Sequence, residues 1–450
     1  MLPSSRRRFL RQGFHAAAAV TAWRGLQIFS RAATPIPAWR TGNEVIDRSR
    51  DIALAILQPT TAQMERAAAL HTSALVFDAY GFAPRAAIDG AAFNAAAQDG
   101  ASPGELNDLR EELSMTRMAT DAREREEFLG AFRAAGVTCI FQNAGEEGND
   151  PVRLLKRLAR FTSATDLLRP TLSKAVRPAD IEAAKAAGQL CLYLTGNGVP
   201  LPQAGESVRD ELRLIRIFQQ LGIRMMHLTY NRRNVIGDGA GEPQDAGLSD
   251  FGRAVVAEMN RSGVIVDTAH SGWKTAFDAA KASAKPMVAS HTSAAGLYRH
   301  FRGKPDDTIK AICDTGGLVG ICCIPRFLGR KGDISAFLDH LDYVAKKFGA
   351  EHVAIGTDVA YASRFEKEER AKIQRRADGT LPGGISPKWE HLWPKDDFQT
   401  TPEMEQSLAW TNWPLFTLGL VQRGYSDDDI RRILGGNILR VAKANFTGQP

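Results

Sequence analysis

The sequence predicts a (β/α)8 barrel of the TIM type, in which eight parallel strands alternate with helices. Short apolar runs recur between residues 74 and 358, and helical segments separate most of them. Two successive runs lead into His270 and His291, and their spacing of 21 residues suits one strand–helix unit. An open, doubly wound sheet is the alternative. It is disfavoured because no glycine-rich phosphate loop follows the first apolar run.

The predicted strands are short stretches of mostly β-branched, aromatic and other apolar residues. In chain order they are residues 74–78, 136–142, 190–195, 223–229, 264–267, 286–290, 317–324 and 352–358. Apolar residues at helical spacing predict the helices. These are residues 43–57, 61–70, 152–161, 206–221, 249–262, 273–283, 305–314, 334–348 and 425–446. Ser249 is expected to cap its helix.

Two insertions interrupt this alternation. Residues 83–135, after the first strand, read as mostly helical, and their charged runs at 110–112 and 123–127 predict a solvated helix face. Residues 361–401, after the eighth strand, are charged and rich in glycine, proline and tryptophan. A long loop at that position is expected to overhang the barrel rim as a lid.

The N-terminus predicts a twin-arginine signal peptide over residues 1–33, followed by a single domain over 34–450. The run Ser5-Arg-Arg-Arg-Phe-Leu10 precedes a short apolar region, whereas the alternative is a merely basic tail. Export of the folded protein would place it in the periplasm or elsewhere outside the cytoplasm. Residues 1–33 hold six arginines and no acid, so they account for the formal charge of +6. The basic balance is therefore no argument for nucleic acid.

The cysteines and the hydropathy give no indication of a disulfide-rich or membrane-spanning protein. The chain has five cysteines, an odd number, and most lie in or beside apolar runs, which predicts buried free thiols. No apolar run approaches the roughly 20 residues that span a bilayer.

Polar residues follow the predicted strands, where a barrel carries its chemistry. Neutral imidazoles bind zinc, so His270 and His291 are candidate metal ligands, with a structural role as the alternative. Asp358 is a candidate base or a group that holds a cationic amine, and otherwise a turn residue. His227 lies inside the fourth strand and is interpreted as a hydrogen-bonded interior residue.

A series of motifs then follows in a fixed order. It includes Gly222-Ile-Arg-Met-Met-His-Leu-Thr-Tyr-Asn231, Asp267-Thr-Ala-His270, Ala289-Ser-His291, Gly356-Thr-Asp358 and Gly435-Gly-Asn437. This order resembles the renal (membrane) dipeptidase family, the M19 metallopeptidases, and the match is densest from 222 to 358. The resemblance implies a (β/α)8 barrel of the amidohydrolase type that hydrolyses dipeptides at a two-zinc centre.

The resemblance also implies a ligand set, which this chain retains only in part. His270 and His291 stand at two of the family's ligand positions. Tyr80 and Phe82 stand where the family has a histidine and an aspartate, and Asn197 replaces its bridging glutamate. Such losses make a second zinc improbable, so one zinc ion at most is expected.

Further roles follow from the same resemblance. Two histidines fall short of the three protein ligands usual for catalytic zinc, so Asp78 is the third candidate ligand, with Asp358 or Tyr80 as alternatives. Tyr230 stands at the family's substrate-contacting histidine, and Arg302 at its arginine for the substrate carboxylate. Tyr80 and Asn197 are then candidate substrate contacts, and Asp358 stands near the substrate amine.

The function expected from these residues is metal-dependent hydrolysis of dipeptides or a related small amide by an exported protein. The alternative is a catalytically altered pseudoenzyme, or a protein that binds a small ligand on the same barrel. The expected partners are the substrate, the twin-arginine export machinery and, in a homodimer, a second copy of the chain. Neither nucleic acid nor a transmembrane segment is expected.

Overall fold

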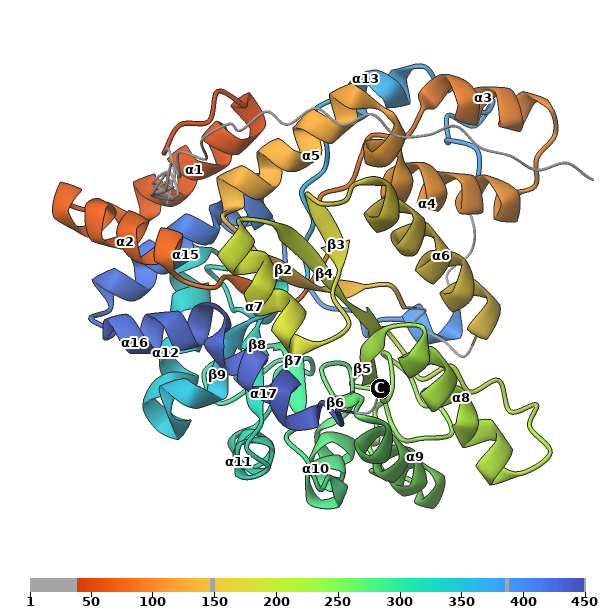
Figure 1. Cartoon of the computed structure of the whole chain (residues 1–450), viewed down its shortest axis with the longest axis vertical. Coiled ribbons are helices and arrows are strands. Elements are labelled where there is room, and N and C mark those ends of the chain that lie inside the picture. Colours follow the sequence, from red (N-terminus) through yellow and green to blue (C-terminus); the bar gives the residue numbers. More distant parts are fainter. Residues whose placement is uncertain (1–38, 146–149, 385–387, 449–450) are drawn as a thin grey trace, which may run out of the picture. The chain divides into compact units, whose positions relative to one another are not determined.

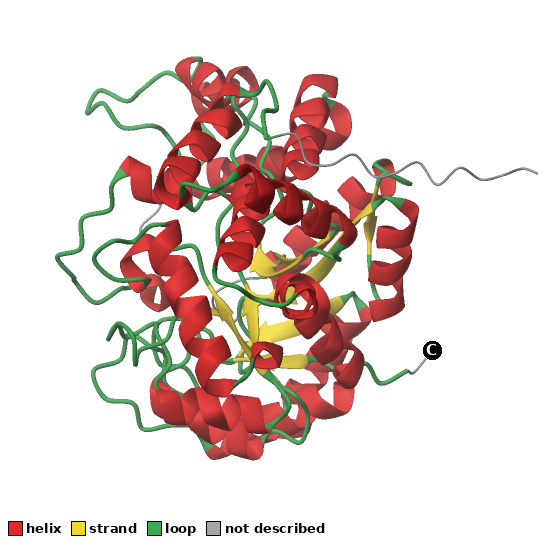
Figure 2. Ribbon diagram, turned by 90° about the vertical axis from the view of Figure 1, so that its left-hand side faces the viewer, coloured by secondary structure: helices red, strands yellow, loops and turns green. Residues whose placement is uncertain are grey.

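The structure is a computed structural model that describes residues 39–145, 150–384 and 388–448, all within one unit of the chain. The signal peptide predicted at residues 1–33 therefore lies outside the described residues. Figure 1 shows strands at the centre with helices around them, and Figure 2 shows the same strands from the side. None of the described helices has the length and apolar character needed to cross a membrane.

Eight strands form a continuous parallel sheet in the order β1-β2-β4-β5-β6-β7-β8-β9. Its two edges meet, because the backbone N–H of Asp358, just after β9, donates to the carbonyl of Tyr80 in β1 over 3.1 Å. The sheet is therefore a nearly closed barrel, which confirms the predicted fold class. The strands of this barrel are β1 Phe77–Gly81, β2 Cys139–Asn143, β4 Leu190–Gly196, β5 Ile223–His227, β6 Ile265–Asp267, β7 Val288–Thr292, β8 Leu318–Ile321 and β9 Val353–Ile355.

One short strand was not predicted. The strand β3, Leu172–Lys174, pairs with β4 and lies off the barrel path. Its three residues are too few for an alternating pattern to stand out in the sequence.

The predicted helices are all present, with shifts of a few residues at their ends. The helices are α1 Glu44–Leu57, α2 Thr61–Ser73, α3 Gly90–Gln98, α4 Pro103–Thr120, α5 Ala122–Ala135, α6 Pro151–Leu167, α7 Pro178–Ala187, α8 Val208–Gln220, α9 Asp250–Ser262, α10 Trp273–Ala282, α11 Asp306–Asp314, α12 Ile334–Phe348, α13 Glu366–Ala371, α14 Pro402–Ser407, α15 Trp413–Gln422, α16 Asp427–Arg431 and α17 Asn437–Asn445. Ser249 caps α9 as predicted, because its hydroxyl accepts from the N–H of Gly252 over 2.9 Å.

The last predicted helix is interrupted rather than continuous. A π-helical turn, Arg432–Gly436, separates α16 from α17. A side chain at Gly435 would lie 2.3 Å from the carbonyl oxygen of Leu75, so this position needs glycine to let the helix approach the start of β1.

The charged insertion after β1 is only partly a solvated face, so that prediction needs correction. Glu124 and Glu127 on α5 are buried. Glu124 accepts from the N–H of Ala87 over 3.1 Å, and Glu127 pairs with Arg364 over 3.1 Å. Glu124 therefore holds α5 against the start of the insertion, and Glu127 connects α5 to the segment after β9.

Aromatic rings fill the inside of the barrel. Phe141 lies 5.2 Å from Phe77 and 4.9 Å from Tyr193, measured between ring centroids. These rings belong to a buried cluster that packs the interior, and barrels of this type carry their chemistry at the strand ends. All five cysteines are buried and free, as predicted.

Candidate active site

Three histidine rings gather at the carboxyl ends of neighbouring strands. His227 is the last residue of β5, His270 follows β6, and His291 lies in β7. Their ring centroids are 5.0 Å apart for His270 and His291, 5.1 Å for His227 and His291, and 5.5 Å for His227 and His270. Adjacent parallel strands bring their ends to one rim, so the structure brings the predicted pair together and adds His227 to it.

Two tyrosines cover these rings. Tyr80 stacks on His291 with a centroid distance of 3.8 Å, and its hydroxyl donates to Asn197 over 2.8 Å. Tyr230 stacks on His270 at 4.0 Å. The predicted substrate contacts Tyr80, Asn197 and Tyr230 therefore lie around the histidine cluster. Phe82 packs edge-on against Tyr80 at 6.0 Å.

Asp78 is placed differently from the histidines. One carboxylate oxygen accepts from the N–H of Thr357 over 2.9 Å, and the other accepts from its hydroxyl over 2.6 Å and from the indole of Trp410 over 3.2 Å. Burial raises the pKa of Asp78 to about 7 against these donors. Both oxygens are thus engaged by protein groups that connect β1 to the segment after β9.

A compact group of possible ligands instead comprises His227, Asp267 and His291. All three are buried, and one ligand atom from each lies within 4.8 Å of the others. His227 Nε2 lies 2.8 Å from Asp267 Oδ2, and Nδ1 of the same ring has no hydrogen-bond partner among the described residues. The predicted interior position of His227 is correct.

Burial keeps the other imidazoles neutral. It lowers the pKa of both His270 and His291 well below the usual value, and the positive charge of Arg302 lowers each further. A neutral imidazole has a free lone pair and can act as a metal ligand without losing a proton first.

Asp358 lies at the rim just after β9. Its backbone has a φ of 57°, in the left-handed region, which costs about 1–3 kcal/mol in a residue other than glycine and is common at functional sites. Burial raises the pKa of the Asp358 carboxyl to about 6, although the positive charges of Arg302, His227 and Arg85 oppose this. The residue as a whole keeps some exposed surface at the rim.

Arg302 is fully buried. Its guanidinium donates to the carbonyl of Ala269 and, over 3.2 Å, to the carbonyl of His291, and it lies 5.2 Å from the Phe327 ring. It therefore holds the segments that carry His270 and His291. The arginine predicted to bind a substrate carboxylate has no exposed surface in this conformation.

The segment after β9 lies over the rim, as predicted for a lid. The guanidinium Nε of Arg232 donates to the carbonyl of Leu392 over 3.0 Å. The ring of His391 lies 5.6 Å from Tyr230, and that of Trp393 lies 6.2 Å from His270. The lid residues therefore border the same aromatic and histidine cluster.

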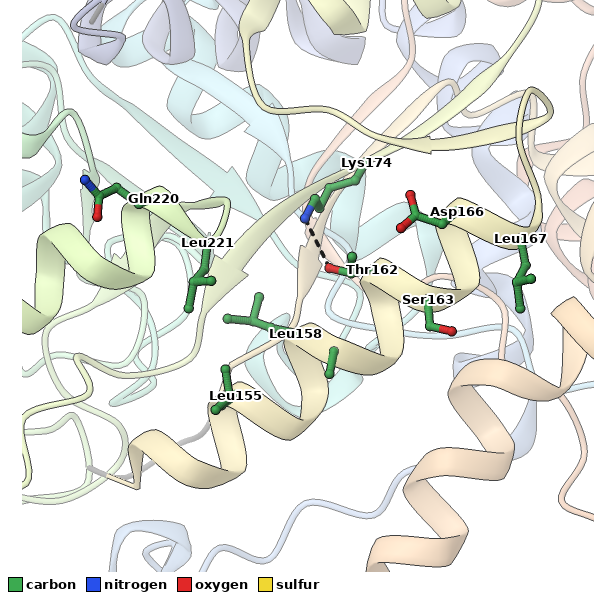
Figure 3. A pocket seen from close by; sticks show the side chains of 10 residues that line it. Leu155, Leu158, Thr162, Ser163, Asp166, Leu167, Lys174, Gln220 and Leu221 are labelled. Atoms are coloured by element: carbon green, nitrogen blue, oxygen red, sulfur yellow. Dashed lines mark hydrogen bonds between the residues drawn. The ribbon is translucent and has the colours of Figure 1, made fainter. Parts of the chain in front are cut away.

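A hollow of about 690 Å³ on the outside of the barrel lies between α6 and α8. Figure 3 shows its lining, which includes Leu155, Leu221 and Lys174. Lys174 donates to the hydroxyl of Thr162 over 3.1 Å. The hollow lies where α8 leads into the start of β5, at the opposite end of the strands from the histidines, so it is separate from the candidate site.

Comparison of the sequence with known proteins identifies the family to which this barrel belongs. The membrane dipeptidase family (Peptidase family M19) matches residues 64–372. The chain belongs to this family. The dipeptidase aclJ of Aspergillus oryzae is 31% identical over 234 residues, which cover 51% of this chain and 46% of aclJ. The match thus spans about half the length of that curated relative.

Two solved structures share the fold. An amidohydrolase from Pseudomonas aeruginosa has a TM-score of 0.60 and 23% identity, with 84% of this chain and 98% of that chain covered. A metallo peptidase from Rhodobacter sphaeroides, liganded with a phosphinate mimic of the dipeptide L-Ala-D-Ala, has a TM-score of 0.57 and 17% identity, with 83% and 99% covered.

Proposed function

We propose that this protein hydrolyses dipeptides or closely related small amides, with one bound metal ion. The observation that carries the proposal is the carboxyl of Asp358, with a pKa of about 6, at the same barrel rim as a cluster of buried histidines, where such folds carry their chemistry. Membership of the membrane dipeptidase family supports the reaction class. The phosphinate mimic of a dipeptide in the Rhodobacter sphaeroides relative supports the substrate class.

The donor set fits one metal ion and does not fit two. Buried, unpartnered ligand atoms are present on His227, Asp267 and His291. Tyr80 and Asn197 instead satisfy each other through a hydrogen bond of 2.8 Å, and neither brings a carboxylate. A zinc ion bound here would act as a Lewis acid that polarises the substrate carbonyl.

Other side chains at the rim would carry out proton transfer and substrate binding. Asp358 is ionised above a pH of about 6 and can accept a proton from the attacking water, then return it to the leaving amine. Tyr230 and Tyr80 form the aromatic walls against which the substrate lies. The hydrogen bonds of the buried Arg302 hold the histidine segments in place, and its charge helps to keep Asp358 ionised.

The test is hydrolysis of Gly-Xaa dipeptides and L-Ala-D-Ala by the zinc-loaded protein, followed by chromatography of the released amino acids. We expect release by the wild type and a loss of about 10²–10⁴-fold in Asp358→Asn, because a positioned proton acceptor contributes that much. Asp314→Asn is the matched control, since Asp314 is an exposed residue paired with Lys310. No release by any zinc-loaded sample would contradict the proposal and favour a binding protein on the same barrel.

We also infer export of the folded protein by the twin-arginine machinery to the periplasm. The support is the run Ser5-Arg-Arg-Arg-Phe-Leu10 and the apolar region after it. Residues 1–40 fused to a reporter should direct it out of the cytoplasm, and Arg6→Lys with Arg7→Lys should abolish this. A reporter that stays in the cytoplasm with the native sequence would refute the inference.

A further inference from the structure

We propose that His227, Asp267 and His291 together hold one divalent transition-metal ion, in place of the set of His270, His291 and Asp78 expected from the sequence. The three side chains are buried at adjoining strand ends, with one ligand atom from each within 4.8 Å of the others. This inference rests on the proposed function, because it names the ligands of the metal ion that hydrolysis would need.

Unpartnered polar atoms in the interior are the first argument. Buried polar atoms in proteins nearly always have a hydrogen-bond partner, because an unpaired one loses its hydration without compensation. Among the described residues, Nδ1 of His227 and Nε2 of His291 have none, and Nε2 of His227 and Oδ2 of Asp267 have no partner besides each other, at 2.8 Å. A cation bound by His291 Nε2, Asp267 Oδ2 and one nitrogen of the His227 ring would give each side chain a partner.

The second argument is that the remaining atoms of two of these side chains are anchored. Oδ1 of Asp267 accepts from the N–H of Ala269 over 2.9 Å and from that of Ser290 over 3.0 Å. Nδ1 of His291 shares a hydrogen bond of 2.8 Å with the Ser290 hydroxyl. Metal ligands are commonly oriented in this way, with one atom held by the protein and the other left for the ion.

The residues expected from the sequence fit less well. Nδ1 of His270 contacts the Oδ1 atom of Asn231 at 3.0 Å, and His270 is not part of the compact group. Both oxygens of Asp78 accept hydrogen bonds, from Thr357 and from Trp410 among others. His270 therefore lies beside the proposed ion and faces Tyr230, whereas Asp78 is a structural link.

The donor set also indicates the class of metal. Two imidazole nitrogens and one carboxylate oxygen match the three protein ligands of catalytic zinc, with a further position left open, and they also suit ferrous iron. His227 and Asp267 are direct partners in the register between β5 and β6, so the barrel itself sets their separation. A metal held by strand residues is more precisely placed than one held by loops.

The experiment measures metal binding by the full-length protein and four variants, independently of activity. Each sample is loaded with zinc, desalted and analysed by elemental mass spectrometry, and its affinity is measured by competition with a chromogenic chelator. The wild type and His270→Gln should each retain about one equivalent of zinc. The affinity for zinc should fall at least 10–100-fold in each of the variants His227→Gln, Asp267→Asn and His291→Gln. Mutation of residues that only hydrogen-bond to metal ligands already weakens binding by that factor.

Circular dichroism identifies the variants that fold. If His227→Gln does not fold, X-ray absorption spectroscopy provides an independent test of the ligands. X-ray absorption spectroscopy of zinc-loaded His270→Gln should still show two imidazole ligands on the zinc. A spectrum with only one imidazole ligand would mean that His270 is itself a ligand and would overturn the inference. Zinc retained by folded His227→Gln, or lost from folded His270→Gln, would overturn it too. Dipeptide hydrolysis by the same samples separates the two proposals. If the three residues bind zinc but the protein hydrolyses no dipeptide, only the proposed function is refuted.

Discussion

The ring of Tyr80 stacks on that of His291 with a centroid distance of 3.8 Å, while the Tyr80 hydroxyl donates to Asn197 over 2.8 Å. A tyrosine and an asparagine thus meet where the family places ligands of its first metal ion. Their hydrogen bond replaces the charges that such an ion would need, and the stacked ring fills the space beside His291. This contact is the basis for our proposal of a single metal ion.

Tyr80→Phe tests this hydrogen bond. The ring can stay in place, but Asn197 loses its donor, so the free energy of unfolding should fall by about 1 kcal/mol. Urea denaturation followed by tryptophan fluorescence measures the change. A second zinc ion in this variant, or an unchanged stability, would show that the Tyr80–Asn197 contact does not hold the site in its present form.

The pH dependence of hydrolysis tests the role of Asp358. Its pKa is raised to about 6, and a proton acceptor works only when ionised, so kcat/KM should rise as the pH increases through about 6 and then level off. Measurement of initial rates between pH 4.5 and 8 on the zinc-loaded protein gives the profile. A rate that stays constant from pH 5 to 7 would remove Asp358 from this role.

Acid should destabilise the fold through His71. This buried ring contacts the Thr417 hydroxyl and the Ala135 carbonyl, each over 2.8 Å, and burial lowers its pKa to about 4. As the pH falls, the His71 ring is protonated in the unfolded chain before it is protonated in the folded protein. The contribution of this ring to the free energy of unfolding is therefore complete above about pH 6.5 and decreases as the pH falls toward 4, by about 3 kcal/mol in all. Urea unfolding of wild type and His71→Gln across this range tests it, and equal pH slopes would contradict it.

The lid should affect substrate binding more than the chemical step. The Trp393 ring lies 5.7 Å from Phe301 and 6.2 Å from His270, so Trp393→Ala should raise KM several-fold with a smaller change in kcat. Trp389→Ala is the matched control, because Trp389 is exposed on the same segment and faces Arg232. If both variants behave alike, the effect belongs to the lid as a whole rather than to Trp393.

The barrel was predictable from sequence because its strands are apolar runs at regular spacing. The rim was predictable in part, since His270, His291 and Asp358 directly follow such runs. His227 was predicted to lie in the interior but not to be a ligand, because an isolated histidine inside a strand does not show which side chains will lie beside it. The signal was its position two residues after Met225, which packs in the barrel interior, so the alternation of a strand points both side chains inward.

The burial of Glu124 and Glu127 could not be predicted for a different reason. Their partners come from distant segments, Ala87 and Arg364, and a charged run on a helix is indistinguishable from a solvated face until those segments are placed. The hydrogen bonds of Asp78 to Thr357 and Trp410 likewise join residues far apart in the chain.

A zinc titration of hydrolysis tests the central claim most directly. Metal-free protein receives increasing zinc, and the release of amino acids from a dipeptide is measured at each ratio of zinc to chain. One ion at the histidine cluster predicts that activity rises linearly and reaches its plateau at one equivalent. A plateau at two equivalents, or no activity at any ratio, would contradict a hydrolase with a single metal ion.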